Sequence, residues 1–256
     1  MSDRPATEDA SEAFAAAPCD RFVLAHGFTQ TARSWAVVGR MIAERRPSAE
    51  VLAVDLPGHG SATDVRGDLW SSAQRLVAIG GTATYVGYSM GGRVALHAAV
   101  THPEAVARLV LIGATAGIDD DGERQARRAA DDRLAGRIED IGVAAFIDEW
   151  LRNPLFAGLD DDTARRDDRL RNTAAGLASS LRSTGTGTQT PLWDVLGELQ
   201  VPVLLLVGEH DSKFTAIAER MRASLPDAVM RVIADAGHSV HLEQPEATVE
   251  AILSWC

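Results

Sequence analysis

Residues 82–100 read TATYVGYSMGGRVALHAAV, and this stretch predicts the fold. A short apolar run rich in β-forming residues enters the motif Gly-x-Ser-x-Gly at residues 87–91, and a helical pattern follows at once. Glycine at both ends of the motif removes side chains that would clash where a strand turns sharply into a helix. We therefore expect Ser89 to occupy a strained turn, with its hydroxyl lifted clear of the sheet and the amide of Met90 beside it.

The chain on both sides of this turn alternates apolar runs with helical patterns. Further strands are predicted at residues 22–25, 51–54, 107–112, 201–207 and 228–233. Loops rich in glycine and proline separate several of these runs from the helices, and Asp68 is predicted to cap one of the helices. Such alternation is typical of an α/β fold, with a mostly parallel sheet covered by helices on both faces.

One long segment does not show this alternation of strand and helix patterns. Residues 118–190 are rich in Asp, Arg and Ala, show helical runs at 123–135, 143–151 and 163–181, and contain no strand pattern. We expect a helical lid inserted into a core formed by residues 20–117 and 191–256; a solvated helical face packed elsewhere is the alternative. Residues 1–19 are small, polar and acidic, which predicts a flexible tail.

Composition excludes several classes of function. The formal net charge of −11 argues against a nucleic-acid partner. The sequence shows no signal peptide and no apolar run long enough to span a membrane, and Cys19 and Cys256 have no metal or redox spacing, so we expect free thiols and a cytoplasmic location. No ligand spacing predicts a metal, and no Gly-x-Gly-x-x-Gly motif predicts a dinucleotide cofactor.

The candidate chemistry is that of an activated serine. A serine hydroxyl needs an imidazole that takes its proton and a carboxylate that orients the imidazole. Asp211 and His238 follow Ser89 in the order expected for this type of sheet, and each comes just after a predicted strand. Glu209 is an alternative to Asp211, whereas Asp235 is too close to His238 in sequence to turn back easily.

The loop after the first predicted strand can complete an oxyanion hole. It reads His26-Gly27-Phe28, and the amide of Phe28 is placed to act together with that of Met90; a simple tight turn is the alternative. His26 and, in a later loop, His59 are interpreted as structural hydrogen-bonding residues rather than as catalytic bases.

The motifs together resemble those of the α/β-hydrolase superfamily. The resemblance covers nearly the whole chain after residue 20 and is carried by HGFT (26–29), DLPGHG (55–60), GYSMGG (87–92), GEHD (208–211) and AGH (236–238). These motifs imply the α/β-hydrolase fold, but many reactions share that fold, so they do not define a function.

A narrower resemblance points to the 2-succinyl-6-hydroxy-2,4-cyclohexadiene-1-carboxylate synthases of menaquinone biosynthesis. It is carried by GYSMGGR (87–93), ERQARR (123–128), Trp150 with PLF (154–156), LRN (170–172), TGTG (184–187) and DSKF (211–214). The resemblance implies a lyase that releases pyruvate from a succinylated enolpyruvyl cyclohexene carrying several carboxylates. The Ser-His-Asp triad would serve as a base, without a cofactor.

The same resemblance implies the residues that bind this small anionic substrate. They are Tyr88, Arg93, Arg127, Trp150 and Arg171. Arginine suits this role because its planar fork pairs with a carboxylate through two hydrogen bonds. Arg128 is a rival to Arg127, because one sequence does not determine which face of a helix points inward; a surface ion pair is the other alternative.

This sequence departs from the family pattern in two places. The chain before residue 20 shows no clear hairpin, so the usual antiparallel start of the sheet is expected to be reduced or absent. Gln30 follows Thr29 where glycine is common, which can alter the pocket floor. A carboxylesterase or a carbon–carbon bond hydrolase is the second hypothesis, and a non-catalytic receptor is the third. The sequence does not predict an oligomeric state.

Overall fold

A computed structural model describes residues 20–256 of the chain, so the predicted N-terminal tail and Cys19 lie outside the described residues. Within them, a six-stranded sheet has the order β2-β1-β3-β4-β5-β6, and every pair of neighbouring strands is parallel. The strands are β1 (Arg21–Ala25), β2 (Glu50–Val54), β3 (Ala83–Tyr88), β4 (Val106–Ile112), β5 (Val203–Gly208) and β6 (Ala228–Ile233). The predicted α/β class is confirmed.

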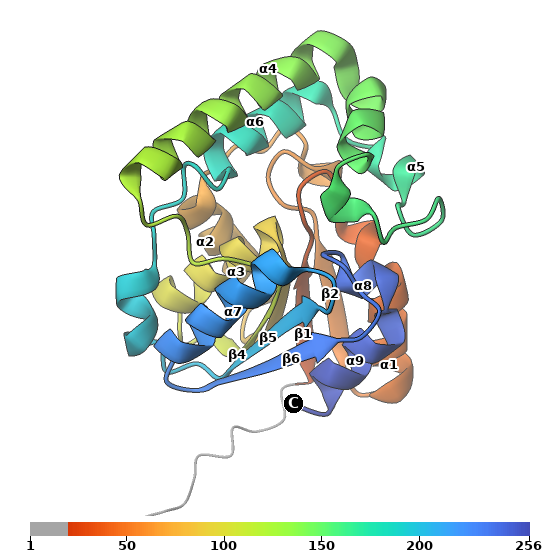
Figure 1. Ribbon diagram of the computed structural model, residues 1–256. Coiled ribbons are helices and arrows are strands. Elements are labelled where there is room, and N and C mark those ends of the chain that lie inside the picture. The colour runs from red at the N-terminus through yellow and green to blue at the C-terminus, as the bar shows by residue number, and fades with distance from the viewer. Residues whose placement is uncertain (1–19) are drawn as a thin grey trace, which may run out of the picture.

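Helices cover both faces of the sheet (Figure 1). The long helices are α1 (Ala36–Arg45), α2 (Leu69–Gly80), α3 (Met90–Thr101), α4 (Asp121–Leu151), α6 (Ala174–Thr184), α7 (Ser212–Ser224) and α9 (Pro245–Leu253). The short ones are η1 (Ala32–Trp35), η2 (Gly60–Ala62), η3 (Pro154–Phe156), α5 (Arg166–Arg169), η4 (Trp193–Glu198) and α8 (Val240–Glu243). Asp68 caps α2 as predicted, because its Oδ1 accepts a hydrogen bond of 2.8 Å from the backbone N–H of Ser71.

Alternation along the strands creates the two cores. In β1, Val23 and Ala25 pack with α2, α3 and α7 on one face, whereas Phe22 and Leu24 pack with α1, α8 and α9 on the other. Successive side chains of a strand point to opposite faces, so a strand buried on both faces is apolar throughout. The apolar runs of the sequence therefore become the buried centre of the molecule.

Residues between β4 and β5 form a separate helical layer. In Figure 1, α4 and α6 cross above the sheet, and an apolar cluster that includes Ile138, Phe146 and Leu177 joins them. Helix α4 has a non-helical residue at Gly142 (φ 77°), which matches the predicted interruption between the first two helical runs. Whether this layer acts as a lid stays a prediction at this point.

The third helical run differs from its prediction. Instead of continuing through residues 163–181, the chain forms α5, breaks, and begins α6 after Thr173, which caps the helix by accepting a hydrogen bond from the N–H of Gly176 (3.0 Å). At the break, Asn172 donates to the carbonyl of Thr29 (2.7 Å) and accepts from the N–H of Gly60 (2.9 Å). These tertiary bonds between distant segments are not visible in a local helical pattern.

Candidate active site

Ser89 lies in the sharp turn between β3 and α3. Its backbone has φ 49° and ψ −107°, a conformation that side chains other than glycine rarely adopt. The turn requires glycine at both flanks: a Cβ on Gly87 would overlap the backbone of Gly91, and a Cβ on Gly91 would overlap the carbonyl of Ala25. The strained turn and its crowded surroundings agree with the prediction from the Gly-x-Ser-x-Gly motif.

His238 and Asp211 form a buried pair beside this turn. Asp211 follows β5 and His238 follows β6, and the imidazole Nδ1 lies 2.6 Å from Oδ2 of the carboxylate. The other carboxylate oxygen accepts the backbone N–H of Phe214 at 3.2 Å and thereby caps α7. An Nδ1–H that donates to Asp211 leaves Nε2 of His238 unprotonated, which is the state required to take a proton from Ser89.

The imidazole of His238 fits between three neighbours. The ring of Phe214 lies 4.4 Å away and that of Tyr88 5.3 Å away, measured between centroids. Gly113, the first residue after β4, has φ +54°, and a Cβ there would come within 2.8 Å of Cε1 of His238. The ring orientation is therefore determined by packing as well as by the hydrogen bond to Asp211.

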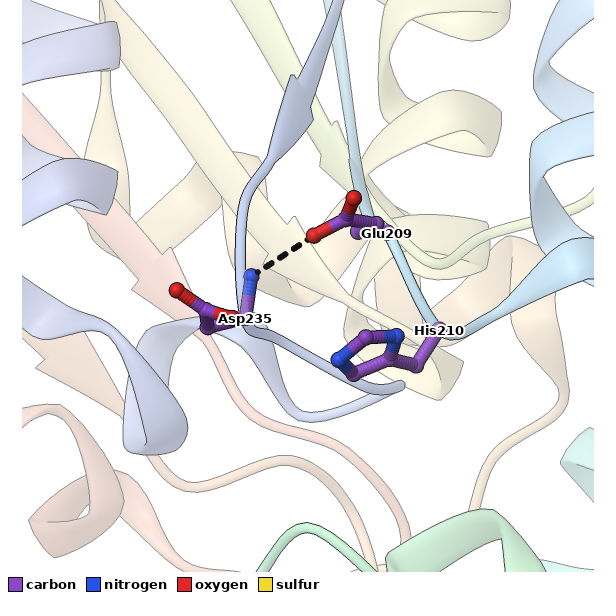
Figure 2. A group of neighbouring side chains, drawn as sticks. All are labelled: Glu209, His210 and Asp235. Atoms are coloured by element: carbon purple, nitrogen blue, oxygen red, sulfur yellow. Dashed lines mark hydrogen bonds between the residues drawn. The ribbon is translucent and has the colours of Figure 1, made fainter.

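The alternative carboxylates do not bond to His238. Figure 2 shows Glu209 and Asp235 with His210 on neighbouring loops, and the Glu209 carboxylate accepts the backbone N–H of Asp235 at 3.1 Å. All three side chains are exposed, and their potential metal-ligating atoms lie within 4.8 Å of one another. An exposed acidic group of this kind is common in proteins without a metal, and it carries no assignment here.

The two predicted oxyanion amides lie in the same place as the serine. Phe28 and Met90 line one cavity with Ser89, and among the described residues no hydrogen-bond acceptor contacts either backbone N–H. N–H groups without an acceptor, in residues that line a cavity together with the serine, are what a developing oxyanion needs. Their role stays a prediction.

Two buried histidines hold the loop that carries Phe28. Nε2 of His59 accepts from the N–H of Thr29 (3.3 Å), and Nε2 of His26 accepts from the N–H of Leu56 (3.1 Å). Burial, with a further contribution from His26, lowers the pKa of His59 to about 3, and burial also lowers the pKa of His26. Both rings are therefore neutral at pH 7, which agrees with the structural role predicted for them.

A cavity of about 140 Å³ opens above Ser89. Its walls are formed by Phe28, Tyr88, Ser89, Met90, Arg93, Arg127, Trp150, Leu155, Phe156, Leu181, Thr184, Gly185, Thr186, Lys213, Phe214 and His238. The structure thus brings four of the five predicted substrate-binding residues together with the serine, the histidine and both amides. The choice between neighbouring arginines is also made, because Arg127 lines the cavity and Arg128 does not.

The two cavity arginines are held in different ways. Arg93 on α3 is buried and donates from Nη1 to the carbonyl of Thr184 at 2.5 Å. Burial, with a smaller contribution from Arg127, lowers the pKa of Arg93 to about 10, so its guanidinium stays charged at neutral pH. Arg127 on α4 is half-exposed and donates from Nε to the buried carboxylate of Asp131 at 2.8 Å. Each arginine keeps further N–H groups for an anionic ligand.

The aromatic residues of the cavity have distinct environments. The Tyr88 hydroxyl bonds to Ser239 at 2.9 Å, and burial raises its pKa, so Tyr88 stays neutral and presents its ring to the cavity. The Trp150 ring lies 5.4 Å from that of Phe28 and 5.9 Å from that of Phe146. Its indole Nε1 is buried without a hydrogen-bond partner among the described residues.

Arg171 departs from the predicted arrangement. It is exposed and lines a separate surface groove of about 730 Å³ with Arg33 and Asp167, away from Ser89. The buried arginine of this segment is Arg169, two residues earlier, which donates to the hydroxyl of Thr29 and to the carbonyl of Ala164. The local sequence does not tell which arginine is buried, because the short helix α5 and the break after it set the direction of each side chain.

Comparison with known proteins agrees with this geometry. The model of the alpha/beta hydrolase family matches residues 22–251, which is most of the chain. The protein belongs to the alpha/beta hydrolase family. In this family the chain is similar to a Bacillus subtilis (strain 168) protein, 38% identical over 87% of this chain and 85% of the relative, whose provisional name is 2-succinyl-6-hydroxy-2,4-cyclohexadiene-1-carboxylate synthase.

Two further proteins are similar to this chain. A Citrobacter koseri protein named 2-succinyl-6-hydroxy-2,4-cyclohexadiene-1-carboxylate synthase is 34% identical over 90% of this chain and 91% of its own. The solved structure of MenH from S. aureus superposes with a TM-score of 0.84 at 32% identity and covers 92% of each chain. The predicted superfamily and the predicted narrower resemblance are both confirmed. No helix in residues 20–256 is long and apolar enough to cross a bilayer.

Sequence reasoning gave no site role to several residues of this alpha/beta hydrolase cavity. Lys213 and Phe214 line it next to Asp211, and Thr184, the last residue of α6, lines it together with Thr186 from the loop that follows. The signal was present, because both DSKF and TGTG carry the narrower resemblance. Only the tertiary structure shows that these two motifs, nearly thirty residues apart, form walls of one cavity.

Proposed function

We propose that this protein is a 2-succinyl-6-hydroxy-2,4-cyclohexadiene-1-carboxylate synthase. It would eliminate pyruvate from 2-succinyl-5-enolpyruvyl-6-hydroxy-3-cyclohexene-1-carboxylate. The observation that carries the proposal is a cavity in which Ser89 and His238 lie together with two arginines, Arg93 and Arg127. A base beside fixed cations suits a polycarboxylate substrate, and the similarity to relatives that bear this name supports the same conclusion.

The residues can carry out the elimination as proton transfer coupled to loss of a leaving group. His238, oriented by Asp211, accepts the Ser89 proton as the serine oxygen removes the proton from ring carbon C2. The C2–H electrons form the C2=C3 bond, the C3=C4 electrons move to C4=C5, and the C5–O bond breaks. The enolpyruvyl group departs as an enolate, and a proton from the imidazolium converts it into pyruvate.

The negative charge that develops during this step is expected on one oxygen of the substrate. C2 is bonded to the succinyl carbonyl, so removal of its proton places charge on the carbonyl oxygen. The amides of Phe28 and Met90 would stabilise that oxygen, because both residues line the cavity and neither N–H contacts an acceptor among the described residues. No acyl-enzyme forms in this sequence of steps.

We further propose that the helical layer of α4 and α6 acts as a lid. Phe146 and Trp150 of α4 pack against Phe28, whose amide is a predicted oxyanion donor, at centroid distances of 6.4 and 5.4 Å. The cavity of about 140 Å³ is smaller than the roughly 300–1,000 Å³ typical of small-molecule sites, so we expect this layer to move when the substrate enters. The cytoplasmic location stays a prediction.

The test is release of pyruvate from freshly prepared substrate, followed with lactate dehydrogenase and NADH. Ser89→Ala and Arg93→Ala are each expected to lower kcat/KM by roughly 10²-fold or more, on the usual scale of general-base and charge-assisted contributions. Wild-type protein that releases no pyruvate would contradict the proposal.

An esterase is the second candidate, because the cavity walls include Phe28, Trp150, Leu155 and Phe156, which suit an apolar acyl group. Rapid cleavage of a p-nitrophenyl ester without pyruvate release would favour it. A receptor would bind the substrate and turn over neither compound.

A further inference from the structure

Lys213 is the single lysine of this chain. The sequence contains 25 lysines and arginines together, and every one except residue 213 is an arginine. This lysine occupies the first turn of α7, two residues after Asp211. A cation there opposes the helix dipole, whose positive end lies at the N-terminus, so the position is unfavourable for helix stability. A residue that breaks a local rule in this way is a candidate for a functional role.

Lys213 lies where three hollows of the surface meet. It lines the catalytic cavity together with Ser89 and His238. It also lines a hollow of about 450 Å³ beside Pro154 and another of about 520 Å³ beside Trp193. The side chain therefore lines the catalytic cavity and both of the neighbouring hollows.

The charge of Lys213 is available to a ligand. Within residues 20–256 its ammonium forms no hydrogen bond or ion pair, and it lies 5.8 Å from the centroid of the Phe214 ring. Each of the two cavity arginines already has a partner within the protein: Arg93 donates to the carbonyl of Thr184, and Arg127 pairs with the carboxylate of Asp131. In a chain of net charge −11, an unpaired cation at the cavity offsets the repulsion of an anionic substrate.

We propose that Lys213 binds a carboxylate of the substrate and is the third cation of the catalytic cavity. The inference rests on the proposed function, whose substrate carries a succinyl, a ring and an enolpyruvyl carboxylate. Arg93 and Arg127 provide two partners, whereas Arg171 lies in another groove. The ammonium of Lys213 can pair with the third carboxylate through its charge and its three rotatable N–H donors.

The first test replaces the charge and measures pyruvate release. Lys213→Gln is expected to lower kcat/KM by roughly tenfold to a hundredfold, mainly through KM, which is the usual scale for a hydrogen bond to a charged group. Lys213→Arg should restore most of the loss, because it restores the charge. Arg222→Gln removes the same charge from an exposed position of the same helix and should leave both constants unchanged.

The second test uses the fact that the chain has one lysine. Acetylation with an N-hydroxysuccinimide ester, followed by peptide mass mapping, reports the reactivity of Lys213 apart from that of the α-amino group. Saturating 2-succinyl-6-hydroxy-2,4-cyclohexadiene-1-carboxylate is expected to slow acetylation of Lys213 severalfold and to leave the α-amino group unaffected. A purely structural lysine would show no such protection.

The outcomes separate this inference from the proposed function. Wild-type protein that releases no pyruvate would overturn the function and, with it, the assignment of the substrate carboxylate. Wild-type protein that is active, combined with a Lys213→Gln variant of unchanged KM, would overturn the role of Lys213 alone. A Lys213→Arg variant as impaired as Lys213→Gln, or acetylation unaffected by the product, would also overturn it.

Discussion

Replacing Gly113 by alanine should impair catalysis although it removes none of the reacting groups. Gly113 follows β4, has φ +54°, and faces the imidazole of His238. A Cβ at this position would lie 2.8 Å from Cε1 and 3.0 Å from Nδ1 of the ring. The added methyl group therefore presses directly on the proposed base.

The size of the effect follows from this geometry. Non-bonded carbon atoms pack at about 3.5–4.0 Å, so the ring of His238 must move by roughly 0.7–1.2 Å. The hydrogen bond of 2.6 Å to Asp211 and the Phe214 ring at 4.4 Å leave little room for that movement. A displacement of about 1 Å in a catalytic group costs on the order of 10²-fold in rate, so kcat/KM for pyruvate release should fall by about that factor.

Gly81→Ala is the matched control. Gly81 has φ +62°, and a Cβ there would meet nothing within 4 Å. Both substitutions place alanine at a positive φ, which costs roughly 1–3 kcal/mol, so both should lower the melting temperature. Only Gly113→Ala should lose activity, measured on protein that is shown to be folded at the assay temperature. Equal kcat/KM values for the two variants would refute the reasoning.

Three further predictions concern other parts of the site. Asp211→Asn should lower kcat by roughly 10²-fold or more with little change in KM, measured by the same pyruvate assay, because the imidazole loses the anion that orients it. The pKa of His59 in the folded protein is lowered to about 3, so its contribution to stability is present above pH 6.5 and is lost as the pH falls toward 3. In urea unfolding, the free energy of unfolding of His59→Asn should therefore fall less steeply between pH 6.5 and pH 3 than that of the wild-type protein. Asn172→Ala should lower the free energy of unfolding by about 1–3 kcal/mol, because the N–H of Gly60 and the carbonyl of Thr29 both lose a partner, and a chevron or urea titration measures the loss.

The fold and the centre of the site could be predicted to a large extent from the sequence. Apolar runs with helices between them predict a parallel sheet, because a strand buried on both faces is apolar at every position. The turn that carries Ser89 can also be predicted from the sequence alone, since its glycines and its serine are close together in the chain and their crowding follows from backbone geometry. The order of Ser89, Asp211 and His238 then places one residue after each of three parallel strands, at the same edge of the sheet.

The sequence by itself therefore determined the class of fold, the strained serine and the type of chemistry, because each depends on neighbours within a few residues or on a repeated period. Only the tertiary structure decided which residues from distant parts of the chain come together at the site. It placed Arg127 rather than Arg128 in the cavity, put Arg171 on the surface, and brought Lys213 beside Ser89. The physical reason is that the direction of a helical side chain depends on how its helix packs, and packing is set by contacts between segments that lie far apart in the chain.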